Sequence, residues 1–457
     1  MEENLNYGIP AQDAGYANQT MENTFVGNEV NTFTTNAEPV MQEAYVQEAV
    51  MQEPVVQEAQ VTAPTEAVAQ PQPKQLQIPE IPEGSVRIIV ETNILKEALK
   101  KADIVALKNE LSPITEVVMF RVIGKTVQVR ASDRENILTV NMDAVDATDG
   151  IVVTLKIAQL KPLIDRIKDD VTVMLVNGTT VTVVTKNGEY NFSQALDLTT
   201  NEIITVPDVD AGSIPFEETA EITKEAFLKS VELVLPLVGD VANDTQYSAI
   251  NIGNKVTSTT GDEVGVFYEN VSGVLGTSAL VKVVTIKDLI AMGVSDKLNI
   301  GFGTLGQYKT MCVYTNGYRL YSVLKEGEEE YPVDEIDNLL GAVVGDYIQI
   351  NKSQLLDAID RLSLFFASNL ARQNLKFEKA GNVLEISNEG KAKERLIVGG
   401  NGNVTIALDR KRLTTVTKSM PTEDILIEPL VNGDGPISYI KVSSTDRKVV
   451  FVIAAAL

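Results

Sequence analysis

The sequence predicts an α+β fold made of three tandem copies of one domain, each with two β-α-β-β-β-like halves. The prediction rests first on three similar stretches, "VETNILKEAL" (90–99), "ITKEAFLKSV" (222–231) and "INKSQLLDAI" (350–359). Each ends a β-like run, passes a polar capping residue (Thr92, Thr223 or Asn351) and then spaces apolar residues four apart, as the buried face of a helix requires. The stretches start 132 and 128 residues apart, which is the size of a domain.

A second helix recurs within each copy and divides it into halves of about sixty residues. Its three versions are "LKIAQLKPLI" (155–164), "VTIKDLIAMG" (284–293) and "LDRKRLTTVT" (408–417). Short β segments such as "VVMFRVIG", "TVQVRAS" and "ILTVNMDAV" occupy the space between the helices. Their alternation of apolar and polar residues predicts sheets with one buried face and one face toward solvent.

Residues 1–84 differ in composition from the rest of the chain. They hold eight of the 17 prolines, 13 acidic residues and a single basic residue, Lys74. Such a segment cannot bury enough apolar surface to offset the entropy lost on ordering, so we expect it to be disordered. The predicted organisation is an acidic low-complexity tail at 1–84, followed by domains at 85–210, 211–343 and 344–457.

The composition argues against most enzyme classes. The chain has no histidine, which removes the commonest general base and the Ser-His and Cys-His nucleophile pairs. Cys312 is the only cysteine, and its apolar surroundings predict a small buried side chain. The run "VGGNGNV" (398–404) lacks the spacing of a phosphate-binding loop and predicts a tight hairpin turn. We expect no enzyme activity, no metal and no cofactor.

The sequence also bears on the compartment. It contains no run of 18 apolar residues, and its first thirty residues lack a basic segment followed by an apolar one. Neither a membrane span nor a secretory signal is therefore expected. Together with the single cysteine, these features predict a cytoplasmic protein that does not bind membranes.

From about residue 86 to 457 the chain resembles the bacterial DNA polymerase III beta subunit, the sliding clamp. The motifs that carry the resemblance are "LKNELSPITEVV", "VRASDRENILTVNMDA" and "GEYNFSQAL" in the first domain, and "SNLARQNLKFEKAGNVLEISN" and "GKAKERLIV" in the third. Two departures are "STTGDEVGVF", where the family has A-T-D-G-H-R-L, and the three alanines at 454–456. They indicate a divergent member of the kind that a phage or mobile element encodes.

The resemblance implies a ring of clamp domains, formed by a homodimer whose two chains meet head to tail. Helices line the hole of such a ring, so a chain with a net charge of −24 could still present positive charge to double-stranded DNA. Contacts to phosphates would be independent of base sequence. The helix candidates are Lys96, Lys100, Lys101, Lys161, Arg166, Lys168, Lys224, Lys229, Lys352, Arg361, Arg410, Lys411, Arg412 and Lys418, and the loop candidates are Lys108 and Arg372. The alternative is ordinary solvated helix faces, paired with acids such as Glu97 and Asp165.

The resemblance also implies two protein partners, a replicative DNA polymerase and a clamp loader. In the family, a hydrophobic cleft between the second and third domains receives a short peptide of the partner. The matching positions are apolar, namely Val264, Leu339, Leu340, Phe451 and Ile453. A few apolar anchors in a groove are what gives short peptides their affinity. For Phe451 and Ile453 the alternative is an inward position on an alternating last strand.

The sequence thus predicts a DNA sliding clamp, a processivity factor that encircles duplex DNA and catalyses no reaction. The second hypothesis is a phage structural or adhesion protein with a low-complexity tail. It explains an acidic, strand-rich chain but not the lysines that recur on the helices. An enzyme is the third and least favoured hypothesis, because the sequence shows no set of residues typical of a catalytic site.

Overall fold

The computed structural model describes most of the chain beyond the tail. The described residues are 76, 78–106, 112–209, 216–240, 245–253, 255–267, 278–294, 296–315, 317–326, 331–366, 373–388, 390–431 and 437–456. They belong to one compact unit, Pro73–Leu457. The loop candidates Lys108 and Arg372 lie outside the described residues, as does the tail up to residue 75.

Six helices form where the apolar spacing predicts them. They are α1 (Thr92–Val105), α2 (Ile157–Arg166), α3 (Lys224–Val234), α4 (Val283–Met292), α6 (Lys352–Ser363) and α7 (Arg410–Ser419). A further helix that the sequence did not predict, α5, spans Val333–Gly341. Short 3-10 turns form at Pro113–Glu116, Leu235–Leu237 and Thr245–Tyr247. None of the helices in the described part of the chain is long and apolar enough to cross a lipid bilayer.

Two of the three predicted helix caps are confirmed. The Thr223 side chain accepts a hydrogen bond from the Ala226 N–H, and the Asn351 side chain accepts from the N–H groups of Ser353 and Gln354. The Thr92 prediction is wrong because Thr92 lies inside α1, where its buried hydroxyl is 3.0 Å from the hydroxyl of Thr172.

The strands repeat one arrangement six times. The first predicted domain holds β1 (Arg87–Glu91), β2 (Val117–Ile123), β3 (Thr126–Ser132), β4 (Asn136–Asp143), β5 (Asp146–Ala147), β6 (Val152–Lys156), β7 (Val171–Asn177), β8 (Thr180–Thr185) and β9 (Gly188–Ser193). The second holds β10 (Phe216–Thr223), β11 (Ala249–Ile252), β12 (Val256–Thr259), β13 (Val264–Phe267), β14 (Ala279–Lys282), β15 (Lys297–Leu305), β16 (Tyr308–Thr315) and β17 (Tyr318–Val323). The third holds β18 (Ile348–Asn351), β19 (Asn374–Ala380), β20 (Val383–Asn388), β21 (Ala392–Ile397), β22 (Val404–Asp409), β23 (Asp424–Pro429), β24 (Tyr439–Ser444) and β25 (Val449–Ala454).

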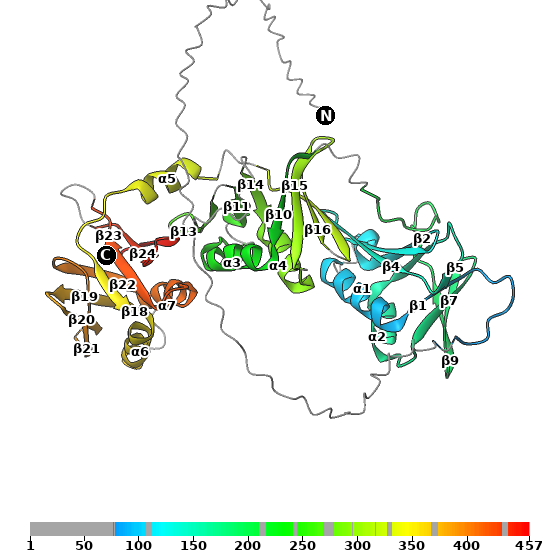
Figure 1. Cartoon of the computed structure of the whole chain (residues 1–457), viewed down its shortest axis with the longest axis horizontal. Helices are drawn as coiled ribbons and strands as arrows, with labels where there is room; N and C mark the ends of the chain where they lie inside the picture. The colour runs from blue at the N-terminus through cyan, green and yellow to red at the C-terminus, as the bar shows by residue number, and fades with distance from the viewer. Residues whose placement is uncertain are drawn as a thin grey trace, which may run out of the picture. The chain divides into compact units, whose positions relative to one another are not determined.

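Each copy of the arrangement is a three-strand antiparallel meander joined by the strand that leads into a helix. For example, β2, β3 and β4 form a meander, and β6, which leads into α2, pairs with β2. We call such a set of four strands a half-sheet. Each domain has a first meander, which follows its first helix, and a second meander, which follows its second helix (Figure 1).

Half-sheets join edge to edge at two places. β4 pairs with β17, which gives an eight-stranded sheet in the order β10-β15-β16-β17-β4-β3-β2-β6. β13 pairs with β25, which gives a second one in the order β14-β11-β12-β13-β25-β24-β23-β18. The other two half-sheets stay separate, as β5-β1-β7-β8-β9 and β21-β20-β19-β22.

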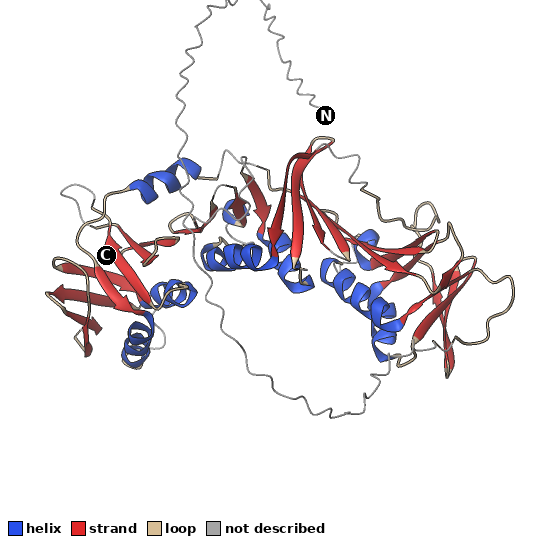
Figure 2. Cartoon of the chain, viewed as in Figure 1, coloured by secondary structure: helices blue, strands red, loops and turns tan. Residues whose placement is uncertain are grey.

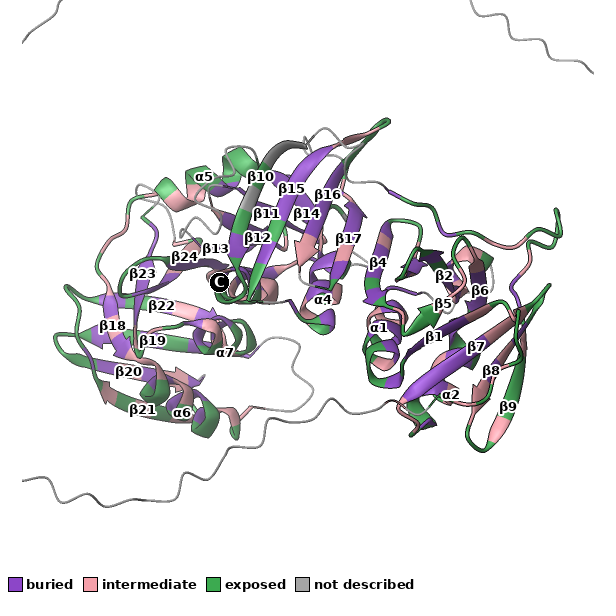
Figure 3. Ribbon diagram, turned by 45° about the vertical axis from the view of Figure 1, so that its right-hand side comes forward, coloured by how far each residue is buried: buried purple, intermediate pink, exposed green. Residues whose placement is uncertain are grey.

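The six predicted helices cover one face of the sheets, which we call the helix face (Figures 2 and 3). Their buried apolar residues, such as Leu95 and Leu413, share one core with strand residues such as Val129 and Phe377. The opposite, outer face carries smaller apolar clusters. Cys312 is buried and free, as predicted.

The end of the predicted tail belongs to the folded body. Leu76 and Ile81 pack against Ile89, Val171 and Val173 on the outer face of the β1–β7–β8 sheet. Because these two side chains pack on the sheet, the folded part of the chain begins upstream of residue 85.

The glycine-rich run 398–404 does not form the predicted hairpin, since the β21 and β22 strands that it connects lie at opposite edges of their sheet. It packs instead against the chain that enters β18. Gly400 has φ +97°, and a Cβ atom at Gly402 would overlap the Asp346 side chain. The glycines therefore allow a close backbone approach.

Candidate functional site

Positive charge concentrates on the helices of the helix face. The six predicted helices carry fourteen Lys or Arg residues and eight Asp or Glu residues, in a chain whose net charge is −24. α7 is the extreme case, with four basic residues and no acidic one. A surface of this kind attracts a polyanion, while the acidic remainder of the chain repels it.

On α1 and α2 the predicted candidates differ in how they are held. Lys96 donates to the Ile167 carbonyl at 2.6 Å, and Arg166 donates to the Pro162 carbonyl at 2.6 Å. Both acceptors are neutral carbonyls, so these hydrogen bonds do not cancel the positive charges. Lys101 lies 3.9 Å from Glu97. Lys161 lies 2.9 Å from Asp165, and this hydrogen bond raises the pKa of Lys161. The solvated-face alternative therefore describes Lys101 and Lys161.

On α3, α6 and α7 four candidates are committed to neighbours. Lys229 lies over the Phe267 ring, 5.7 Å from its centroid. Lys352 donates to the Met420 carbonyl at 2.8 Å, and Arg410 donates to Gln373 at 2.6 Å. Arg361 forms an ion pair with Glu394 at 2.8 Å.

Arg412 reaches across to the second domain, 2.7 Å from Glu263. The candidates that remain unengaged share two properties, an exposed side chain and no ion pair within the described residues. They are Lys100, Lys168, Lys224, Lys411 and Lys418.

The five predicted cleft residues separate into two groups. Val264 lies in an apolar cluster on the outer face with Val450 and Val452, and Leu339 and Leu340 pack against it. Because side chains alternate along β25, Phe451 and Ile453 point to the other face. Both are 0% exposed and belong to the core beneath the helices. The expectation of one shared groove is thus wrong for Phe451 and Ile453.

The sequence pattern did not reveal the other members of this cluster. Val450 and Val452 are the residues of β25 that face this cluster, where Phe451 and Ile453 were expected. Ile336 lies on α5, and Tyr331 lies just before it. α5 is held in place by a Lys255–Asp337 ion pair and by Lys441, which donates to the Leu340 carbonyl at 2.9 Å. We call the set Val264, Tyr331, Ile336, Val450 and Val452 the outer cluster.

An exposed apolar rim adjoins the outer cluster. Val343, two residues after the end of α5, is 71% exposed, and Val431 beside it donates its N–H to the Val343 carbonyl at 3.0 Å. Leu339 and Leu340 are partly exposed on the same side. Contiguous apolar surface of this type is typical of a protein-binding site.

The described residues hold no group of acidic or cysteine side chains that could bind a metal ion. No protein-family model matches the sequence, and no curated protein does. Comparison with solved structures, however, finds the same three-domain clamp fold. The chain has the fold of bacterial DNA polymerase III beta subunits.

Three of these structures illustrate the likeness. The sliding clamp of Pseudomonas aeruginosa bound to griselimycin is 17% identical, with a TM-score of 0.69 over 82% of this chain and 100% of that one. The beta subunit of Thermotoga maritima is 15% identical, with a TM-score of 0.66 over 81% and 99%. The sliding clamp of Bacillus subtilis is 14% identical, with a TM-score of 0.69 over 82% and 99%.

Proposed function

We propose that this chain is a DNA sliding clamp: a homodimeric ring that encircles duplex DNA and tethers a replicative DNA polymerase without catalysing a reaction. The fold shared with bacterial clamps supports the proposal. The single observation that carries it is a rule of strand pairing, which leaves two edge strands, β9 and β21, without the partner that the rule would give them.

The rule holds at both joints. At each joint, the last strand of the first meander of one domain pairs antiparallel with the last strand of the second meander of the next domain. β4 and β17 follow it between the first and second domains, and β13 and β25 follow it between the second and third. Each pairing turns two half-sheets into one eight-stranded sheet.

The two strands left over are the ones that a second chain would pair. β9 ends the second meander of the first domain, β21 ends the first meander of the third, and each is the edge of its sheet. The same rule would pair β21 of one chain with β9 of the next. Two chains arranged head to tail would then use every such edge and close a ring.

The surroundings of both edges fit an interface. Ile397, at the end of β21, is 72% exposed, and Leu364, just after α6, is 81% exposed. A hollow of about 210 Å³ beside β9 is lined by residues that include Leu163 and Tyr190. Open edges with exposed apolar side chains are prone to pair with another chain, so a stable protein covers them.

DNA would lie against the helix face. Lys100, Lys168, Lys224, Lys411 and Lys418 are the principal phosphate contacts that we propose, because no carboxylate in the described residues neutralises them. Lys108 and Arg372 remain additional candidates. A closed ring needs no tight contact, because linkage around the DNA prevents dissociation while weak phosphate contacts permit sliding.

Protein partners would use the outer face. A peptide of the polymerase or of the clamp loader would bind at the outer cluster and its rim, with Leu339, Leu340 and Val343 as the accessible anchors. The buried positions Phe451 and Ile453 would support the strand from beneath.

The experiment is retention on DNA of different topology. The protein is loaded onto nicked circular DNA by its cognate loader and washed at high salt. We expect it to stay on the circle and to be released when the circle is cut. Release by salt alone, with no effect of cutting, would contradict a ring and favour simple electrostatic binding or the structural-protein hypothesis.

A further inference from the structure

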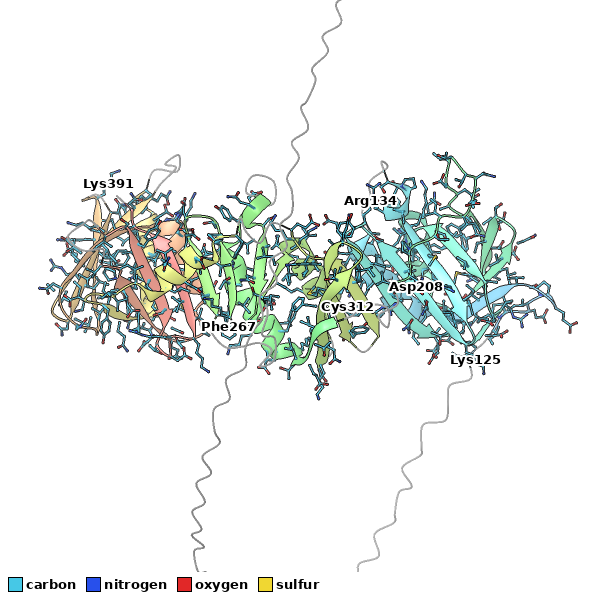
Figure 4. The ribbon with its side chains drawn as sticks, turned by 90° about the horizontal axis from the view of Figure 1, so that it is seen from above. Lys125, Arg134, Asp208, Phe267, Cys312 and Lys391 are labelled. Atoms are coloured by element: carbon cyan, nitrogen blue, oxygen red, sulfur yellow. The ribbon has the colours of Figure 1, made fainter. Side chains whose placement is uncertain are left out.

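Three arginines converge on one carboxylate on the outer face of the first joint. Asp208 belongs to the connector between the first and second domains, and Figure 4 labels it at the strands of the first predicted domain. Its carboxylate lies 2.6 Å from Arg130, 3.3 Å from Arg319 and 3.6 Å from Arg121. One negative charge therefore faces three positive ones.

The sheet register brings the arginines together. Arg319 on β17 pairs with Thr139 on β4, and Thr139 pairs with Arg130 on β3, so the three residues form one row across the joint. Arg121 on β2 lies in the adjacent row, opposite Gln128. All point away from the helix face, because their strand neighbours Val129 and Phe120 belong to the helix-side core.

Asp208 and Gln128, whose side-chain oxygen also accepts from Arg130, satisfy this group incompletely. Arg130 is 1% exposed, and its Nε has no hydrogen-bond partner among the described residues. Burial lowers the pKa of Arg130, an effect that Asp208 opposes. A buried guanidinium with an unpaired N–H is costly unless an acceptor is supplied. The nearby Asp149 carboxylate already accepts from the Gly124 N–H at 2.7 Å.

A cavity lies beside the arginines. Its volume is about 490 Å³, and Arg121, Arg130, Asp149 and Asp208 form its charged part. Met119, Val152 and Val206 form an apolar wall. Arg121 is 44% exposed and so is accessible from solvent. The cavity can therefore hold a small anion together with a short aliphatic group.

We propose that this cavity is an oxoanion site, in which Arg121 and Arg130 bind a phosphate or carboxylate group and Asp208 acts as the chain's own competing occupant. Guanidinium groups bind such anions through paired N–H donors, and an anion with several oxygens satisfies more of them than one aspartate can. The site is independent of the proposed clamp function, because it uses strands and the outer face instead of the helices.

The test is calorimetric titration of the full chain with two probes, inorganic phosphate and N-acetylglutamate amide, at an ionic strength held constant with chloride. We expect one saturable site for at least one probe. Binding of phosphate alone identifies a free oxoanion as the ligand. Binding of the glutamate probe identifies an acidic side chain of a polypeptide. Saturable binding of neither probe, to the parent or to Asp208→Asn, overturns the proposal.

Three variants locate the site. Arg121→Gln should weaken binding at least tenfold, whereas the control Arg87→Gln, which removes a partly exposed arginine from β1, should not change it. Asp208→Asn should tighten binding by about tenfold, because it removes a competing charge. An equal loss in both arginine variants, or weaker binding by Asp208→Asn, would refute the assignment. Melting temperatures verify that each variant is folded.

Discussion

The guanidinium of Arg412 on α7 lies 2.7 Å from the carboxylate of Glu263 in the β12–β13 hairpin, and this ion pair links the second predicted domain to the third. The Glu263 side chain is buried, and burial raises its pKa although Arg412 opposes the shift. Arg412 is therefore better explained as a joint residue than as a DNA contact.

Replacing Arg412 tests this assignment. Arg412→Gln leaves a buried carboxylate without its cation, so we expect the free energy of unfolding to fall by about 1–3 kcal/mol. Lys411→Gln on the same helix is the control and should change it by less than about 0.5 kcal/mol. Urea denaturation measures both. Adding Glu263→Gln to Arg412→Gln should recover most of the loss, and equal effects of Arg412→Gln and Lys411→Gln would count against the joint role.

The pH dependence of stability should reveal Asp288 on α4. Burial and the charge of Asp133 raise the pKa of Asp288 to about 7, from an ordinary value of 3.8. Between about pH 4 and pH 7 the folded state therefore holds a proton on Asp288 that the unfolded state has released. Stability from this group is complete below about pH 4 and is lost as the pH rises toward about 7.

Asp288→Asn imitates the protonated carboxyl and is the matching variant. We expect its free energy of unfolding to exceed that of the parent at pH 8 and to equal it near pH 4. Parallel curves for the two proteins from pH 4 to pH 8 would show that Asp288 titrates normally.

The sequence predicted the six helices well, because apolar residues four apart define a buried face without knowledge of the partner. It could not assign the faces of β25. In "VVFVIAAAL" every residue is apolar, so alternation cannot distinguish Phe451 and Ile453 from Val450 and Val452. The face follows only from pairing with β13 and from what α5 covers.

Sites that depend on register were also beyond the sequence. Arg130, Arg319 and Asp208 are far apart in the chain and meet only because β4 joins β3 to β17. The open edges are similar, since "GEYNFS" and "AKERLI" read as ordinary strands. Their role as candidate interface strands becomes apparent only once the pairings β4–β17 and β13–β25 are known.

The ring interface can be tested at Ile397. Ile397→Asp places a charge on an exposed edge position, so the monomer should fold normally while the dimer dissociates. We expect the mass from analytical ultracentrifugation to halve at micromolar concentration. The control Val145→Asp, at an exposed valine away from β9 and β21, should leave the dimer intact. A dimeric Ile397→Asp protein would exclude the β9–β21 pairing.

DNA contact by the unengaged lysines can be tested by charge reversal. A variant with Lys100, Lys411 and Lys418 replaced by Glu should bind linear duplex DNA more weakly, and log K should fall less steeply with log salt by at least about 2 units. The control reverses Lys125, Lys376 and Lys391, of which the first and last are labelled in Figure 4. Fluorescence anisotropy measures both slopes. Identical slopes for the two variants would mean that net charge alone, and not the helix face, governs binding.

The partner site can be tested at two apolar positions, of which one is buried and the other exposed. Ile453 is fully buried beneath β25, so Ile453→Ala should lower the free energy of unfolding by about 2–5 kcal/mol. Its effect on peptide affinity should be small at temperatures where the variant is folded.

Val343 is 71% exposed on the rim of the outer cluster, so Val343→Asp should leave stability unchanged within about 0.5 kcal/mol. A charge there should weaken binding of the cognate polymerase peptide at least tenfold, because the rim would no longer accept an apolar anchor. Urea denaturation and calorimetric titration measure the two quantities for each variant. Loss of peptide binding in folded Ile453→Ala, with normal binding by Val343→Asp, would move the partner site away from the outer cluster.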